Sequence, residues 1–430
     1  MTTVQRVRRP LVAVAVFALG AAAWSGPASA LDTAQFRIQS QGQGAGQGVG
    51  RQQQADRQVR FATFNASLNR FTEGELVEDL STADDPQAAA VAEIIQRVRP
   101  DVLLVNEFDY DANHEALQLF QRNYLSVPHN GARAIRYPYR YTAPSNTGVP
   151  SGFDLDNDGS VGGPNDAFGF GFFPGQFGMA VYSKYPIDSD GVRTFQLFEW
   201  EDMPGALLPD NPDTPEPADF YSPEELDVFR LSSKSHWDLP ILVGKRAVHF
   251  LVSHPTPPVF DGPEDRNGRR NHDEIRFWAD YVRPGQASRY IYDDAGERGG
   301  LQPGARFVIA GDMNADPFDG DSTAGAAQQL LDHPRVNTKQ TPASKGAIEA
   351  SLRQQDVNLT HRGGARFDTA DFAEPPGNLR VDYVLPSKQL RISDSAVFWP
   401  VRSNPLSRLT GTFPFPSSDH RLVWVDVRAR

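Results

Sequence analysis

Several residues that can bind a metal ion or transfer a proton stand at the ends of short apolar runs. They are Asn65, Glu107, His254, Asp312, Asn314, Asp382, Asp419 and His420. A strand end is a place where a rigid scaffold presents side chains to a cleft. Carboxylate and amide oxygens suit hard cations such as Mg²⁺, Mn²⁺ and Ca²⁺, and histidines stabilise or protonate oxygens in group transfer. Each residue alone can equally cap a turn or end a strand, so the chemical interpretation depends on the whole set.

The elements that must position these residues are short apolar runs with the length of buried strands. They cover residues 59–64, 102–105, 179–182, 248–253, 307–310, 381–385 and 422–427. A helix is predicted from Pro86 to Val98, with proline in its first turn and Pro100 after its end. Because strands alternate with helices only in places, the predicted class is α/β with mixed sheets.

The first thirty residues are typical of a signal peptide. Arginines precede an apolar run at residues 11–23, and an A-x-A cleavage site ends at Ala30. The pair Arg8-Arg9 leaves both the general secretory and the twin-arginine routes open. The apolar run is too short to span a bilayer, and no later segment is longer and uncharged. We therefore expect a secreted or periplasmic protein without a transmembrane segment.

Residues 31–58 are expected to form a disordered Gln/Gly-rich tether, because they hold too few apolar side chains to repay the entropy of ordering. One folded domain is expected over residues 59–430, with insertions at about 126–178 and 199–229. The second insertion holds ten acidic residues and no Lys or Arg. Loops of this length are usually functional or disordered.

Charge and cysteine content exclude some chemistry. The formal charge of −12 becomes −15 once the three arginines of the signal peptide are removed, so bulk charge does not hold a polyanion. Local cations or metal ions must neutralise any phosphate-bearing substrate. The absence of cysteine excludes thiol nucleophiles, thiolate metal sites and disulfides.

Six motifs follow one another in a recognisable order. They are Asn65 at a strand end, L-x-x-N-E ending at Glu107, S-H-P around His254, G-D-x-N-A-D-P at residues 311–317, R-x-D-Y at residues 380–383, and S-S-D-H at residues 417–420. This order resembles the endonuclease/exonuclease/phosphatase superfamily, which includes pancreatic deoxyribonuclease, exonuclease III, inositol polyphosphate 5-phosphatases and neutral sphingomyelinases. The resemblance covers residues 59–428 and implies a four-layered sandwich of two mixed β-sheets flanked by helices.

The resemblance also implies a division of roles at a metal-dependent site. Glu107 would be the principal metal ligand, supported by Asn65 and Asp419. The implied metal is Mg²⁺ or Mn²⁺, with Ca²⁺ as a further candidate.

The implied reaction is in-line attack of water on phosphorus. Asp312 would act as the base or orient the water, and Asn314 would face the scissile phosphate. His254 and His420 would stabilise the phosphoryl oxygens, and Asp382 would hold the ring of His420 in the required tautomer.

The substrate class stays open at this point. A secreted phosphodiesterase such as a nuclease is favoured, with a phosphomonoesterase or a lipid phosphodiesterase as alternatives. The substrate would accordingly be a nucleic acid, a phospholipid head group or a small phosphoester, and no protein partner is indicated. From another class, the chain can be a non-catalytic, calcium-stabilised binding protein, but such a protein is expected to lack one of the motif residues.

Weaker signals lie outside these motifs. Asp154, Asp156 and Asp158 match the start of a calcium loop, but Asn165 stands where an EF-hand has its closing Glu. A structural calcium loop and a solvated turn both fit. Residues 168–173 interleave Phe and Gly, which fits either an apolar rim for a lipid or base, or packing of the insertion.

Three basic residues are candidates for substrate binding. Arg269 and Arg270 can contact phosphate, or they can form a solvated helix entry. Asn271 and Glu274 have the spacing of a capping arrangement that would begin a helix there. His236 precedes another expected strand, and it can face the cleft or pack in the core.

Overall fold

The computed structural model describes residues 58–429. The predicted signal peptide and all but the last residue of the predicted tether lie outside the described residues. No helix within the described part of the chain has the length and apolar character needed to cross a membrane.

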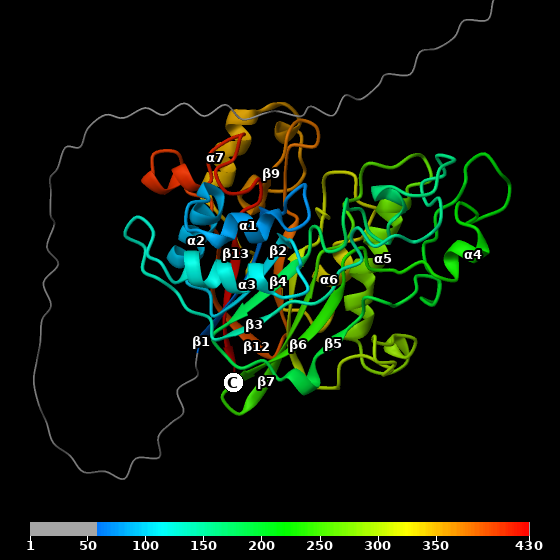
Figure 1. The fold of residues 1–430 in the computed structure, drawn as a ribbon, viewed down its shortest axis with the longest axis horizontal. Coiled ribbons are helices and arrows are strands. Elements are labelled where there is room, and N and C mark those ends of the chain that lie inside the picture. Colours follow the sequence, from blue (N-terminus) through cyan, green and yellow to red (C-terminus); the bar gives the residue numbers. More distant parts are fainter. Residues whose placement is uncertain (1–57, 430) are drawn as a thin grey trace, which may run out of the picture. The chain divides into compact units, whose positions relative to one another are not determined.

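The first sheet has six strands in the order β12-β13-β1-β2-β4-β3 (Figure 1). These strands are β1 (Gln58–Leu68), β2 (Val102–Phe108), β3 (Tyr139–Tyr141), β4 (Met179–Ser183), β12 (Leu390–Val397) and β13 (Val423–Ala429). β1 runs parallel to β2 and antiparallel to β13, so the sheet is mixed. Pairing of β1 with β2 becomes irregular between Asn65 and Leu68, where the strand bends away from its neighbour.

The second sheet has five strands in the order β11-β8-β7-β6-β5. They are β5 (Arg193–Thr194), β6 (His236–Val243), β7 (Arg246–Ser253), β8 (Arg306–Asp312) and β11 (Asp382–Pro386). Only the β7–β8 pair is parallel among these strands, and a separate ribbon joins β9 (Ala370–Asp371) to β10 (Asn378–Leu379).

Helices cover the outer faces of both sheets. The α-helices are α1 (Glu75–Ser81), α2 (Pro86–Val98), α3 (Glu115–Leu119), α4 (Pro223–Leu226), α5 (Arg266–Tyr281), α6 (Gln328–Leu331) and α7 (Lys345–Gln354). A π-helical turn (Phe120–Leu125) continues α3, and 3₁₀ turns occupy Pro164–Asp166, Ser189–Gly191, Gln286–Ser288, Asp356–Leu359, Ala365–Phe367 and Pro405–Leu409. α2 begins as predicted, with Asp85 accepting a hydrogen bond from the backbone N–H of Ala88 (2.6 Å).

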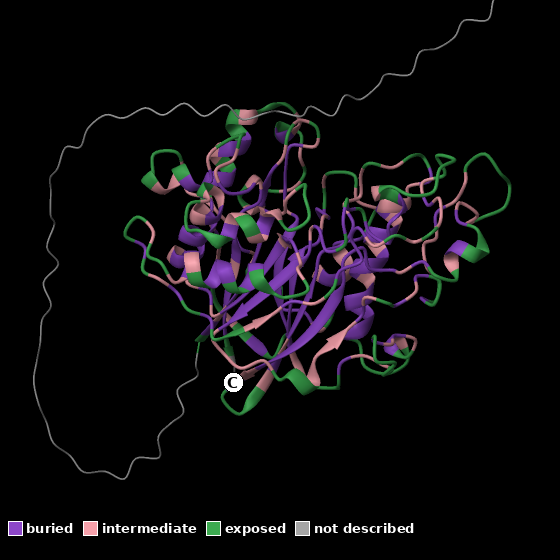
Figure 2. Ribbon diagram, in the orientation of Figure 1, coloured by how far each residue is buried: buried purple, intermediate pink, exposed green. Residues whose placement is uncertain are grey.

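Three apolar clusters hold the layers together. Alternate residues of each strand face opposite sides, so Phe61 and Leu104 of the first sheet meet Phe250 and Val308 of the second. The opposite face of the first sheet packs on α1, α2 and α3, and that of the second sheet packs on α5 and α6. Figure 2 shows buried residues concentrated in the sheets and exposed residues on the loops. The result is a four-layered α/β sandwich of two mixed sheets flanked by helices.

The predicted start of the helix after the arginines is wrong. α5 begins at Arg266 rather than at Asn271, which lies fully buried inside the helix. Asn271 instead donates to the backbone carbonyls of Thr256 and Met313 (2.8 and 2.9 Å). The capping spacing is therefore coincidental, because this side chain fixes two loops that only the tertiary fold brings together.

Candidate active site

The ends of strands from both sheets meet at one place. Asn65 lies in β1, Glu107 lies in β2, and Asp312 ends β8. The amide nitrogen of Asn65 donates to Glu107 Oε1 (2.9 Å) and to Asp312 Oδ2 (3.1 Å). One buried side chain thus links the carboxylates of the two sheets.

Asn106 also connects the two sheets at this junction through hydrogen bonds of its side chain. Its Oδ1 accepts hydrogen bonds from Thr63 Oγ1 (3.2 Å) and from the backbone N–H of Asp312 (3.3 Å). Its Nδ2 lies 3.5 Å from the carbonyl oxygen of Ser253, at the end of β7. The residue before Glu107 therefore sets the spacing between the sheets.

Two imidazoles converge on Asp312. The Nε2 atoms of His254 and His420 lie 3.5 and 3.6 Å from Asp312 Oδ2. The Nδ1 atom of His420 lies 2.9 Å from Asp382 Oδ2, which also accepts a hydrogen bond from Thr369 Oγ1 (2.8 Å). Antiparallel pairing of β11 with β8 sets Asp382 directly opposite Asp312. The structure thus brings together all four residues that the motifs single out for acid–base work.

The two imidazoles have opposite electrostatic surroundings. Burial and the nearby charge of Lys234 lower the pKa of His254 to about 4, so this ring is neutral at neutral pH. Burial also acts against a charged His420, but the carboxylates of Asp382 and Asp312 outweigh it and raise its pKa well above the usual value. His420 is therefore a cation with its Nδ1 proton held by Asp382.

The carboxylates of Asp312 and Glu107 also have pKa values shifted in opposite directions. Burial alone would raise the pKa of Asp312, but cationic His420 and the hydrogen bond from His254 hold it below its ordinary value. Burial raises the pKa of Glu107 to about 7, and the charges of Asp419 and Asp312 act in the same direction. Glu107 is thus the carboxylate whose negative charge most needs a cation.

The available donor atoms fit a hard divalent cation. Ligand atoms of Asp312, Asp382 and His420 lie within 4.8 Å of one another, but cationic His420 has no free lone pair for a metal, so only the carboxylates of this group are available as ligands. Within the described residues, the buried Oδ1 atom of Asp382 has no hydrogen-bond partner. Carboxylate oxygens of this kind suit Mg²⁺ or Mn²⁺. Asn65 presents its amide nitrogen to Glu107, so its predicted role as a ligand requires the opposite orientation of the amide.

Two site residues occupy the left-handed region of backbone space. Glu107 has φ 55° and Asn314 has φ 51°. Such conformations cost about 1–3 kcal/mol each and persist where the surrounding structure enforces them. Asn314 is held by its N–H to Asp312 Oδ1 (2.9 Å) and by its side-chain amide to the carbonyl of Pro255 (3.0 Å). The strain is therefore stored where chemistry is expected.

Asp419 is half-buried at the edge of the cluster. Its Oδ1 lies 3.4 Å from Ser67 Oγ, and its charge acts on Glu107. The neighbouring Ser418 donates its hydroxyl to the carbonyl of Asn65 (2.7 Å). The S-S-D-H motif is thereby attached to the end of β1.

The three predicted substrate-binding residues lie apart from the cluster's hydrogen bonds. Both ring nitrogens of buried His236 lie near protein oxygens, a serine hydroxyl (3.0 Å) and a backbone carbonyl of α5 (2.9 Å). Buried Arg270 donates to backbone carbonyls, and Arg269 donates to one more (3.1 Å). Most of these donors hold α5 against the preceding loops, whereas Nε of Arg269 has no hydrogen-bond partner within the described residues, and a role in substrate binding stays a prediction.

Lys234 is a charged residue of this region that the motifs did not single out. Its side chain is 6% exposed, and its charge acts on His254, Glu107 and Asp312. It belongs to no motif and stands outside a strand, so only the packing of the two sheets reveals its position.

The predicted calcium loop forms a compact turn. Ligand atoms of Asp154, Asp156 and Asp158 lie within 4.8 Å of one another. Asp154 also accepts hydrogen bonds from the backbone N–H groups of Asp158 (3.0 Å) and Gly159 (2.8 Å). Both interpretations of the loop are compatible with this geometry, and calcium binding stays a prediction.

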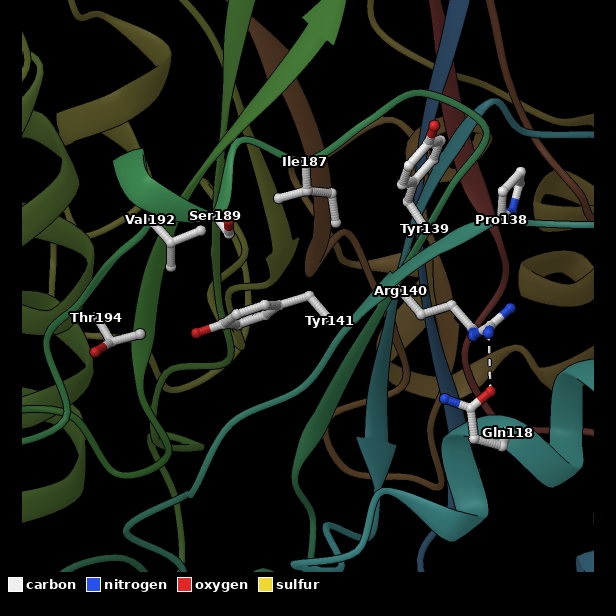
Figure 3. A pocket seen from close by; sticks show the side chains of 9 residues that line it. All are labelled: Gln118, Pro138, Tyr139, Arg140, Tyr141, Ile187, Ser189, Val192 and Thr194. Carbon is white, nitrogen blue, oxygen red and sulfur yellow. Dashed lines mark hydrogen bonds between the residues drawn. The ribbon is translucent and has the colours of Figure 1, made fainter.

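A separate pocket of about 510 Å³ lies beside the edge strands β3 and β5 (Figure 3). Tyr141 crosses it toward Val192 and Thr194, and Arg140 at its border donates to Gln118 Oε1 (2.8 Å). Tyr139 pairs with Ser183, at the end of the sheet opposite to Glu107. The pocket is therefore distinct from the candidate site.

Comparison with known proteins gives one match to a family. The model of the Endonuclease/Exonuclease/phosphatase family matches residues 62–420. Similar solved structures include an endonuclease/exonuclease/phosphatase from Beutenbergia cavernae DSM 12333, at 16% identity over 87% of this chain and 72% of that chain, with a TM-score of 0.46. A sphingomyelinase C from Streptomyces griseocarneus has 14% identity over 86% of this chain and 99% of that chain, with a TM-score of 0.39. No sequence among the curated proteins matches the chain.

Proposed function

The chain belongs to the endonuclease/exonuclease/phosphatase family, and from this membership we propose that it is a divalent-metal-dependent phosphoesterase, foremost a phosphodiesterase. The observation that carries the proposal is the convergence of Asn65, His254 and His420 on one oxygen of Asp312. A degenerate scaffold has no reason to keep such a set of buried polar groups, because each one costs free energy to bury.

In the proposed site, Glu107, Asn65 and Asp419 would hold Mg²⁺ or Mn²⁺. A bound divalent cation supplies positive charge to the oxygens of the phosphoryl group as they become more negative. The buried carboxylate of Glu107, with its raised pKa, supports this assignment.

The remaining residues act on water and phosphate. Because the pKa of Asp312 is held low, it is a weak base, and its proposed task is to orient the attacking water. Cationic His420 would donate a proton or a hydrogen bond to a phosphoryl oxygen, with its ring held by Asp382. Neutral His254 would donate its single N–H to a phosphoryl oxygen instead of to Asp312, without adding charge, and Asn314 would face the phosphate.

A lipid phosphodiester is the second candidate substrate, because exposed aromatic rings lie on the loops that follow β1 and precede β4. Phe71 and Phe172 are 79% and 58% exposed, and their ring centroids lie 6.5 Å apart. Gln176 joins their loops by accepting from Phe172 N–H (2.8 Å) and donating to the carbonyl of Arg70 (2.6 Å). By contrast, Phe168 and Phe173 are buried, so the Phe/Gly segment both packs the loop and exposes an apolar edge.

The proposal also includes export. The signal-peptide pattern ending near Ala30 supports a secreted or periplasmic enzyme. A secreted enzyme would meet extracellular nucleic acids, lipids and small phosphoesters.

The test is hydrolysis by the purified chain of bis(p-nitrophenyl) phosphate, p-nitrophenyl phosphate, DNA, RNA and sphingomyelin. We expect turnover with Mg²⁺ or Mn²⁺, loss after chelation and recovery on adding metal back. Asp312→Asn should lose most turnover, whereas Asp394→Asn, on exposed β12, should not. Absence of hydrolysis of every ester with each metal would refute the proposal.

A further inference from the structure

Lys234 is held rigidly beside the candidate site. On one side of it, the backbone N–H of Ser233 donates to Glu274 Oε1 (2.8 Å). The carbonyl of Lys234 itself accepts a hydrogen bond from the backbone N–H of Asn146 (2.8 Å). The backbone that carries this lysine is therefore fixed by contacts to α5 and to the insertion.

The strand register of the second sheet places the residues just before β6 next to the candidate site. His236 of β6 pairs with Ser253 of β7, and the two strands are antiparallel. Lys234, two residues before His236, consequently lies beside the residues that follow Ser253, of which the first is His254. Its charge acts on Glu107 and Asp312, which come from two further strands.

The ammonium group of Lys234 has no protein partner within the described residues. No carboxylate there lies within ion-pairing distance of it, and its Nζ neither donates to a protein acceptor nor is sealed from solvent. Burial lowers its pKa, while Glu274, Glu107 and Asp312 favour the charged form. A lysine buried to this degree without a partner is unusual, since lysine is almost never buried unless it is paired.

A role as the counter-charge of Glu274 does not explain this arrangement. Glu274 Oε1 already accepts from the N–H and hydroxyl of Ser233 (2.8 and 3.2 Å), and its Oε2 accepts from the N–H of Thr256 (2.6 Å). Its carboxylate is therefore satisfied without the lysine.

The site itself provides a reason for an additional cation. Glu107, Asp312, Asp382 and Asp419 make the site strongly acidic, and a phosphate ester brings further negative charge. Buried Arg421, which follows the S-S-D-H motif, is already paired with an acid of its own (3.0 Å). Beside His420, Lys234 is a further cation next to the carboxylates, and it can meet an anionic ligand.

We propose that Lys234 binds a non-bridging oxygen of the substrate phosphoryl group and so determines the affinity of the site for phosphate. The inference rests on the proposed function, because it assigns the lysine to the same site. The phosphoryl oxygen would take the place of the missing protein partner, and a charge-assisted hydrogen bond of this kind is stronger than one between neutral groups.

The test measures binding of inorganic phosphate by calorimetry in saturating Mg²⁺. Lys234→Met keeps the length of the side chain and removes its charge. We expect its dissociation constant for phosphate to be about 10- to 100-fold higher than that of the wild type, the effect of losing one charged hydrogen bond. The matched control is Lys245→Met, at the exposed turn of the same β6–β7 hairpin, which should bind phosphate as the wild type does.

Two further measurements separate the explanations. Lys234→Arg should retain most phosphate affinity because it keeps the charge. If Lys234→Met does not fold, the comparison is made between Lys234→Arg and the neutral variant Lys234→Gln. Equal phosphate affinity in wild type and neutral variant, or no phosphate binding by the wild type, would overturn the role of Lys234. Hydrolysis of the ester panel tests the proposed function separately. Phosphate binding that depends on Lys234 without hydrolysis would leave the lysine's role standing and refute the activity.

Discussion

Asp382→Asn is the substitution that most directly tests the proposed state of His420. It removes the charge that lies 2.9 Å from Nδ1 of the buried ring and leaves a group of nearly the same size. A hydrogen bond to a charged group contributes roughly 1.5–3 kcal/mol, and one pKa unit corresponds to about 1.4 kcal/mol. The pKa of His420, now raised well above its usual value, should therefore fall by about 1–2 units.

The direction in which the pH profile shifts depends on whether the protonated or the neutral form of His420 is active. If the cation is needed, activity is lost as the pH rises through the pKa of His420, and lowering this pKa moves that loss to lower pH. The assay is the pH dependence of kcat for bis(p-nitrophenyl) phosphate between about pH 5 and about pH 9. Turnover should also drop by about 10²-fold below that limb, near the lower limit for loss of acid–base catalysis, because the ring of His420 loses the carboxylate that orients it.

The control for this experiment is Asp394→Asn, which removes an exposed carboxylate on β12. Its pH profile should coincide with that of the wild type. If the basic limb of Asp382→Asn stays at the wild-type pH, Asp382 does not govern the proton on His420 and the assignment of the cation is wrong. A circular dichroism spectrum of each variant shows whether the fold is retained.

Three further variants address the metal, the predicted calcium loop and the packing of the sheets. Glu107→Gln should raise the Mg²⁺ or Mn²⁺ concentration needed for half-maximal turnover by about tenfold or more, because an amide carries no charge; an unchanged midpoint in a metal titration contradicts this. Changing Asp154, Asp156 and Asp158 together to Asn should remove the rise in Tm that calcium causes, and a wild-type Tm insensitive to calcium would show a plain turn. Gly311→Ala should destabilise the fold by roughly 1–3 kcal/mol in urea unfolding, because its Cβ would lie 2.0 Å from the carbonyl oxygen of Ser253; wild-type stability would argue against this close approach.

The sheets and much of the site could be predicted because both leave local signals. The apolar runs at 102–105 and 307–310 are short and continuous, as strands buried on both faces must be, and they lie inside β2 and β8. Polar residues directly after such runs then stand at strand ends. Glu107 and Asp312 stand at such strand ends, but they belong to different sheets, and that they share one site was implied by the resemblance of the six motifs to a family.

The residues whose surroundings could not be predicted from the sequence depend on contacts between distant segments. Asn271 and Glu274 have the spacing of a helix cap, yet both are buried because β7 and the loop after β8 close over α5. His236, which could face the cleft or pack in the core, is the first residue of β6, and its neighbour is α5 rather than the carboxylates. Lys234 has no motif at all. In each case the environment is created by strand register and helix packing, which single residues do not encode.

The junction of the two sheets makes some residues poor probes of chemistry and others good ones. Asn106 and Asn65 hold β1, β2 and β8 together, so their loss changes the distance between the carboxylates as well as any direct role. His254 is different, because within the described residues its Nδ1 atom has no hydrogen-bond partner and its Nε2 is 3.5 Å from Asp312. Few structural contacts depend on this ring. A loss of turnover on removing His254 with an unchanged Tm would therefore report chemistry, whereas the same loss at Asn106 would report the alignment of the sheets.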